Sequence, residues 1–169
     1  LEDTKDLEKL QYLDVQYNSF RGAFPSSVSK WSNMQQLIVA NNNFTGALPS
    51  DITSLTGLQV LNVMDNGFSG ELPGNIGSLT SLTYLALASN SFNGTLPSSL
   101  GQLTKLNYLD ASKNSLSGEI PEEIGKPGLK YLSLSSNKLN GKIPSTIGDT
   151  NVTYLDLAMN MLQGPLPSE

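Results

Sequence analysis

Leu58-Gln-Val-Leu61-Asn-Val63-Met-Asp-Asn66-Gly-Phe68-Ser-Gly70-Glu-Leu72-Pro73 is one copy of a motif that recurs along this chain of 169 residues. Its asparagine marks the period, in four steps of 24 residues and then two of 23, at Asn18, Asn42, Asn66, Asn90, Asn114, Asn137 and Asn160. A fixed period in this range is typical of a solenoid, in which each repeat is one supersecondary unit stacked on its neighbours. The function of such a protein lies on a surface rather than in a central cleft.

The apolar residues before each asparagine predict a short strand. Leu58, Leu61 and Val63 have the spacing of a strand whose alternate side chains point inward, and equivalent triplets precede the other asparagines. We expect these strands to stack in parallel, one per repeat. Asparagine carries a donor and an acceptor on a short stem, so it can satisfy the backbone of the sharp turn that follows. We therefore assign the seven asparagines a structural role and no ligand.

The second half of the motif predicts the return path of the coil. Gly70 and its equivalents indicate a positive φ or a close approach to the neighbouring coil. Pro73 suits an extended segment or a turn, and Leu72 before it is expected to point inward as a second short strand. Ile76 and its equivalents would complete each coil from a 3₁₀ segment or a one-turn helix.

These features predict one continuous array, mostly β and irregular with short 3₁₀ or helical turns. We place a partial repeat at 1–6 and seven repeats at about 7–30, 31–54, 55–78, 79–102, 103–125, 126–148 and 149–169.

Composition excludes several classes of function. The net charge is −5 and the 10 basic residues are scattered, so nucleic acid and anionic membrane are poor partners. No apolar run approaches the length of a membrane-spanning helix, so we expect no membrane insertion by this segment. Histidine and cysteine are absent, which removes the commonest general base and the thiol nucleophile. The carboxylates show no paired spacing, and we predict no enzymatic activity, no cofactor and no metal site.

The repeat pattern L-x-x-L-x-L-x-x-N-x-L-x-G-x-I-P resembles the plant-specific class of leucine-rich repeats. Asn114-Ser-Leu-Ser-Gly118-Glu-Ile-Pro121 matches it best, and the resemblance covers residues 7–167 in seven in-phase copies. It implies an α/β solenoid, a right-handed superhelix with a concave parallel β-sheet and a second short sheet beside it. The class is similar to the extracellular parts of plant receptor-like kinases, receptor-like proteins and polygalacturonase-inhibiting proteins. The family's paired-cysteine caps are missing here, so the chain looks like an internal fragment of a longer array or an uncapped member.

Outward strand positions carry whatever specificity such an array has. Seven strands about 4.8 Å apart present a ladder roughly 30 Å long, which fits an extended peptide or a protein edge. Ile38, Val60 and Met64 put apolar side chains on this face, and a partner is the usual reason for such a patch. The candidate partner-binding residues are Tyr12, Tyr17, Ile38, Val60, Met64, Tyr84, Tyr108, Tyr131 and Tyr154.

Two plainer interpretations stand beside that prediction. Tyrosine is a common strand residue in this repeat class and need not contact a ligand. Asp14, Asp110 and Asp156 could anchor basic groups of a peptide, although solvated surface charges are the simpler interpretation.

Three N-x-[ST] triplets predict N-glycosylation, at Asn43, Asn93 and Asn151. Such triplets also arise by chance in a chain rich in Asn, Ser and Thr. Together with the family resemblance they place the protein outside the cell, in the secretory pathway or at the cell surface.

The leading hypothesis is a non-catalytic recognition module, the extracellular ligand-sensing segment of a plant receptor-like kinase or receptor-like protein. Its partners would be a peptide or protein ligand and a co-receptor. The alternative is a secreted hydrolase inhibitor, similar to polygalacturonase inhibitors, or a structural wall-associated protein. A third hypothesis is a spacer without a ligand surface, whose uncapped termini would allow end-to-end self-association.

Overall fold

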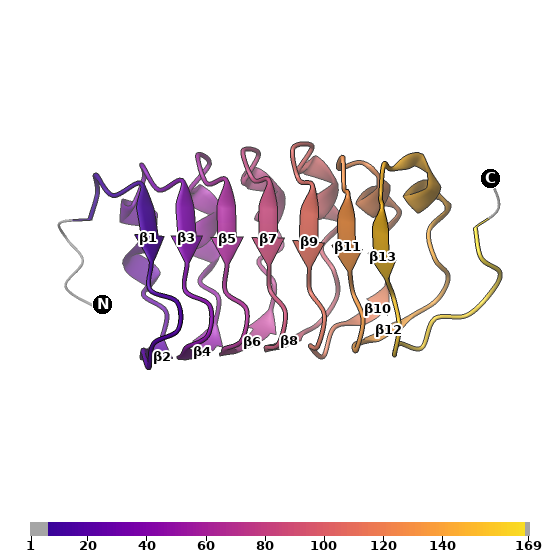
Figure 1. Cartoon of the computed structure of the whole chain (residues 1–169), viewed down its shortest axis with the longest axis horizontal. Helices are drawn as coiled ribbons and strands as arrows, with labels where there is room; N and C mark the ends of the chain where they lie inside the picture. Colours follow the sequence, from indigo (N-terminus) through magenta and orange to yellow (C-terminus); the bar gives the residue numbers. More distant parts are fainter. Residues whose placement is uncertain (1–6, 168–169) are drawn as a thin grey trace.

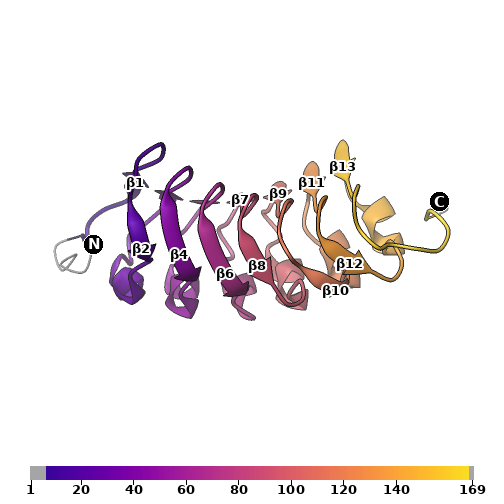
Figure 2. The same cartoon turned by 90° about the horizontal axis from the view of Figure 1, so that it is seen from below.

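Each coil of the chain begins with a three-residue strand that contributes to one parallel sheet. The computed structural model describes residues 7–167. The sheet follows sequence order and contains β1 (Tyr12–Asp14), β3 (Gln36–Ile38), β5 (Val60–Asn62), β7 (Tyr84–Ala86), β9 (Tyr108–Asp110), β11 (Tyr131–Ser133) and β13 (Tyr154–Asp156). The strands lie side by side along the molecule (Figure 1), on the inner side of a shallow curve (Figure 2). The predicted right-handed leucine-rich repeat solenoid is confirmed.

A second sheet borders the first along the next side of each coil. Its strands are β2 (Arg21–Ala23), β4 (Asn43–Ala47), β6 (Gly67–Glu71) and β8 (Ser91–Asn93), followed by the separate pair β10 (Ser117–Glu119) and β12 (Lys138–Asn140). The expected second strand ends earlier than predicted, because β6 stops at Glu71 and leaves Leu72 outside it. Leu72 still points inward and is buried. Pro73 has no N–H for the ladder, which explains why pairing stops before it.

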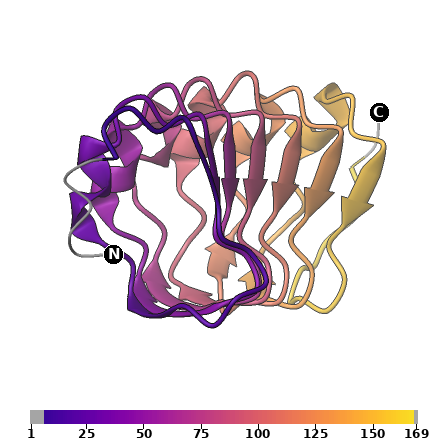
Figure 3. The same cartoon turned by 60° about the vertical axis from the view of Figure 1, so that its left-hand side comes forward.

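The third side of each coil is a short 3₁₀ helix that follows the proline of the motif. These segments are η1 (Ser26–Lys30), η2 (Ser50–Ser54), η3 (Ile76–Ser78), η4 (Ser98–Gln102), η5 (Glu122–Gly125) and η6 (Ser145–Asp149). Figure 3 shows the three sides around the interior. The 3₁₀ segments stack closely: a Cβ on Gly77 would overlap the backbone oxygen of Ser99 in the next coil.

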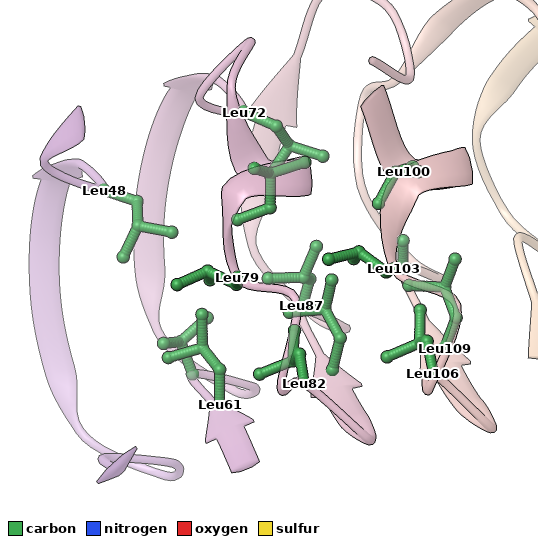
Figure 4. Close-up of a cluster of buried hydrophobic side chains, with 14 of the residues drawn as sticks. Leu48, Leu61, Leu72, Leu79, Leu82, Leu87, Leu100, Leu103, Leu106 and Leu109 are labelled. Carbon is green, nitrogen blue, oxygen red and sulfur yellow. The ribbon is translucent and has the colours of Figure 1, made fainter. Parts of the chain in front are cut away.

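The interior is a continuous spine of apolar side chains. Leucines from both the strands and the return segments fill it, as Figure 4 shows around Leu82 and Leu106. Phe20, Phe44, Phe68 and Phe92 stack along the molecule, with successive ring centroids 6.1–6.2 Å apart. Trp31 is fully buried at the N-terminal end of this spine, and its indole N–H has no hydrogen-bond partner among residues 7–167.

The predicted asparagine ladder is present and bonds between coils as well as within them. Asn66 donates from Nδ2 to the carbonyls of Val63 and Met64 in its own coil, at 3.2 and 3.1 Å. It also donates to the Val39 carbonyl of the preceding coil at 3.0 Å, and its Oδ1 accepts the Phe44 N–H of that coil at 3.0 Å. Asn42, Asn90, Asn114, Asn137 and Asn160 repeat this pattern. The ladder therefore joins neighbouring coils at the turn.

Candidate partner-binding face

The outward side of the seven-stranded sheet, called the sheet face below, brings the predicted partner-binding residues together. The pairing register places Tyr12, Gln36, Val60, Tyr84, Tyr108, Tyr131 and Tyr154 in one column across the strands. A second column runs parallel to it and contains Asp14, Ile38, Asn62, Ala86, Asp110, Ser133 and Asp156. This places the predicted residues on one surface, but whether they bind a partner stays a prediction.

Four tyrosines form one continuous aromatic stack, called the tyrosine stack below. The ring centroids of Tyr84 and Tyr108 are 4.2 Å apart, those of Tyr108 and Tyr131 are 4.4 Å apart, and those of Tyr131 and Tyr154 are 4.3 Å apart. All three pairs are within 11° of parallel. Burial between neighbouring rings raises the pKa of both Tyr108 and Tyr131. Tyr108 and Tyr131 are therefore covered on both ring faces, whereas Tyr154 at the end of the stack is 47% exposed.

Ile38, Val60 and Met64, called the apolar patch below, surround Asn62 at the N-terminal half of the sheet face. Ile38 pairs with Asn62 across the strands, Val60 lies two residues before Asn62, and Met64 lies two residues after it. All three apolar side chains are half-buried. The patch is therefore contiguous and in contact with solvent.

Tyr12 and Tyr17 lie at the N-terminal edge of the sheet face and are the most exposed of the predicted tyrosines. Tyr12 is 53% exposed and Tyr17 is 76% exposed. The Tyr12 hydroxyl donates to Asp14 Oδ2 at 3.1 Å, and this hydrogen bond raises the Tyr12 pKa. Neither residue belongs to the tyrosine stack.

Small side chains, called the floor below, occupy the centre of the sheet face. Ala86, Ala88, Ser112 and Ser133 point outward from the sheet yet are buried. They lie below their taller neighbours, which include Tyr84 and the other members of the stack. The centre of the sheet face beside the tyrosine stack is therefore built from small, buried side chains.

Carboxylate and amide groups in the second column cap the strand ends in alternate repeats. Asp14, Asn62, Asp110 and Asp156 each accept, through Oδ1, the backbone N–H two residues later. Asp110 is only 7% exposed, so it is not the solvated surface charge that the sequence favoured. Its burial is one feature of this face that the sequence did not predict.

A rim of left-handed backbone positions borders the sheet face. The residue before each ladder asparagine has φ between 51° and 55°, at Tyr17, Asn41, Asp65, Ser89, Lys113, Ser136 and Met159. None is glycine, so the side chain at each rim position is held in a fixed direction by a backbone that L-residues rarely adopt. Asp65 and Lys113 put exposed charges on this rim.

Other surfaces of the molecule give fewer indications of a functional site. Asn43, Asn93 and Asn151 are all exposed, and glycosylation at these residues stays a prediction. A groove of about 600 Å³ lies on the C-terminal coils where β10 leads into η5, and Glu119, Glu122 and Lys142 line it. Within residues 7–167, no cluster of three acidic side chains is arranged to hold a metal ion. No helical segment in that range has the length and apolarity needed to cross a bilayer.

The chain belongs to the leucine-rich repeat family. The family model Leucine Rich Repeat matches six stretches, at 9–31, 33–55, 57–79, 81–103, 105–127 and 128–150. The seventh repeat that we placed at 149–169 lies beyond the matched stretches, and the repeat boundaries stay predictions. A comparison with curated protein sequences gave no match.

Solved structures similar to this chain include plant receptor ectodomains. The leucine-rich repeat ectodomain of the membrane receptor kinase GASSHO1/SCHENGEN3 from Arabidopsis thaliana, in complex with CASPARIAN STRIP INTEGRITY FACTOR 2, is 39% identical with a TM-score of 0.87. The match covers 90% of this chain and 18% of that one. The plant peptide hormone receptor RGFR1, in complex with RGF2, is 33% identical with a TM-score of 0.78, over 90% of this chain and 29% of the receptor.

A third similar structure is that of a protein with a different activity. A plant ice-binding protein is 31% identical with a TM-score of 0.86, and the match covers 91% of this chain and 51% of that protein. The same coil therefore serves more than one function, and the fold alone does not decide between them. The function of this chain therefore depends on the side chains of its sheet face.

Proposed function

We propose that this chain is a non-catalytic segment of the extracellular, ligand-sensing part of a plant receptor-like kinase or receptor-like protein. Its sheet face receives an extended peptide or the edge of a protein ligand, with a co-receptor as a further partner. The observation that carries the proposal is the contiguous sheet face, on which the apolar patch and the tyrosine stack flank a floor of small side chains.

Physical reasons favour a partner over an unused surface. Hydration of exposed apolar side chains is unfavourable in free energy, and a partner that covers them removes this cost. Apolar patches on a surface therefore commonly mark interaction sites. Stacked tyrosines are already ordered, so they lose little side-chain entropy on binding. Two similar receptors have structures in complex with named ligands, which supports the same use of this fold here.

The alternative, a secreted hydrolase inhibitor or wall-associated protein, has less support. A strongly basic concave face would favour it, but Asp14, Asp65, Asp110 and Asp156 outnumber Lys113 on the sheet face and its rim. An inhibition assay with a polygalacturonase separates the two functions, and we expect no inhibition.

Peptide selection tests the proposed function. Panning a random-peptide display library on the immobilised chain should enrich specific sequences, and calorimetry on the synthetic peptides gives their affinities. Replacing Ile38→Asp together with Val60→Asp places charge in the apolar patch and should weaken those peptides about tenfold or more. Circular dichroism must show that the double variant keeps its fold.

The matched control lies on the second sheet. Thr45 and Ser91 are exposed on β4 and β8, and Thr45→Asp with Ser91→Asp adds the same two charges away from the sheet face. This control should leave the affinities unchanged. Equal affinity of the selected peptides for the folded Ile38→Asp, Val60→Asp variant would reject the sheet face as the binding surface.

A further inference from the structure

We propose that the sheet face selects an extended peptide carrying a Lys or Arg side chain three or four residues away from a bulky aliphatic side chain. The basic group contacts Asp110 beside the hydroxyl edges of Tyr108 and Tyr131, and the aliphatic group covers Ile38 and Val60. This inference rests on the proposed function and names the class of ligand for the same face.

Asp110 supplies the anionic end of the site. Its side chain is more than nine-tenths buried, and Oδ1 accepts the Ser112 N–H at 3.0 Å. Among residues 7–167, no hydrogen bond or ion pair engages its Oδ2. That oxygen is not sealed from solvent, because the only fully enclosed and unpaired side-chain atom in the described part of the chain is Trp31 Nε1. A desolvated carboxylate with one free oxygen gains more from a cationic partner than an exposed one does.

The tyrosine stack forms one wall of this anionic site. Asp110 lies two residues after Tyr108 on β9, and the register pairs Asp110 with Ser133 and Tyr108 with Tyr131 on β11, so the carboxylate lies beside both tyrosines. Besides burial, the charge of Asp110 helps to raise the pKa of both phenols. Each phenol stays protonated at neutral pH, and its oxygen can accept a hydrogen bond from an ammonium or guanidinium group. The stacking holds both rings in place before a ligand arrives.

Charge across the sheet face and its rim also favours a basic ligand. Asp14, Asp65, Asp110 and Asp156 are present there, whereas Lys113 is the single cation in the two columns and the rim. This excess of carboxylates attracts cationic peptides and repels acidic ones.

The distance between the two ends sets the spacing in the ligand. Two strand steps separate β5 from β9 and three separate β3 from β9, which is roughly 10–14 Å at about 4.8 Å per step. An extended peptide advances about 3.3 Å per residue and covers this distance in three or four residues. Ala86 and Ala88 lie between the two ends, so the peptide backbone can pass close to the sheet.

The test compares peptide selection on the wild-type chain with selection on Asp110→Asn. Asn62 occupies the equivalent position in β5 and accepts the Met64 N–H in the same way, so asparagine at position 110 preserves the turn. We expect wild-type selection to enrich a basic residue three or four positions from an aliphatic one, in either chain direction. Selection on Asp110→Asn should lose the basic residue and keep the aliphatic one. Asp51→Asn, on the exposed surface of η2, is the matched control and should select as the wild type does.

A selected peptide then permits a double-mutant cycle. Replacing its basic residue with Met, or Asp110 with Asn, should each weaken binding about tenfold, and combining the two should add little. Enriched peptides that require Ile38 and Val60 but contain no spaced basic residue would overturn this inference and leave the proposed function standing. Enriched peptides that are indifferent to the whole sheet face would overturn both.

Discussion

Asn66 shows how one side chain holds two coils together. Its amide group donates to carbonyls of its own turn and of the preceding coil, and its Oδ1 caps the Phe44 N–H. Asn18 has the same place in the motif, but among residues 7–167 it donates only to carbonyls of its own coil, those of Val15 and Gln16. A comparison of Asn66 with Asn18 therefore distinguishes the hydrogen bonds that join two coils from those that close the turn within one coil.

This difference predicts unequal effects of removing the two asparagines. Asn66→Ala leaves the Phe44 N–H unpaired and removes one of the donors to each of the Val39, Val63 and Met64 carbonyls, and should lower the free energy of unfolding by about 2–4 kcal/mol. Asn18→Ala affects an exposed turn and should cost about 1 kcal/mol or less. Urea unfolding followed by circular dichroism measures both. Similar losses from the two variants would show that the inter-coil bonds add nothing.

The positive φ at the rim is a residue-scale feature that the sequence could not reveal. Gly70 and its equivalents were predicted to adopt a positive φ or to approach the neighbouring coil closely, and all seven adopt a positive φ. The rim position is occupied by residues as different as Tyr17, Lys113 and Met159. The type of side chain at the rim does not predict its positive φ, because the turn that the asparagine closes imposes this backbone conformation whatever the local preference of the residue.

At the scale of elements, the spacing of leucines predicted the sheet, its parallel order and its outward columns. It did not predict the tyrosine stack, because ring orientation depends on how side chains pack across neighbouring strands. Asp110 was misjudged for the same reason: the outward direction of a strand position does not determine burial when tall side chains stand beside it. The end of β6 at Glu71 was also misplaced, since proline limits pairing from the following residues.

The tyrosine stack predicts a loss of stability in alkaline solution. Burial, aided by the nearby Tyr84 and Asp110, raises the Tyr108 pKa above its ordinary value of 10.0. The folded state then holds the phenol proton more tightly than the unfolded state does. The stabilisation is complete below pH 10.0 and is lost as the pH rises through the higher value of the folded state.

Tyr108→Phe tests this pH dependence because phenylalanine keeps the ring and removes the ionisable group. The urea midpoint of the wild-type chain should fall as the pH rises above 10.0, and the fall should be smaller for Tyr108→Phe. At neutral pH the two proteins should be close in stability. An identical alkaline fall in both proteins would exclude Tyr108 as a source of the pH dependence.

At the scale of the whole molecule, every coil in the middle of the array is covered on both sides by neighbours. The last described coil is different, since Leu155 is 41% exposed and Leu166 is 78% exposed. In the described part of the chain, β13 pairs only with β11 and β1 only with β3, so each end of this seven-stranded sheet has one open edge. Apolar side chains beside an open strand edge favour association with another chain.

The 169-residue chain on its own is therefore predicted to associate end to end. The open edge of β13 in one copy can continue the parallel sheet at the β1 edge of another, a head-to-tail contact that does not close on itself. Light scattering should show a mass that rises with concentration. Leu155→Arg with Leu166→Arg places charge at the contact and should keep the protein monomeric, whereas Ser98→Arg, exposed on η4, should associate as the wild type does. A wild-type chain that stays monomeric at the highest soluble concentration would show that the exposed leucines do not drive assembly, and would leave the sheet face as the main surface for partners.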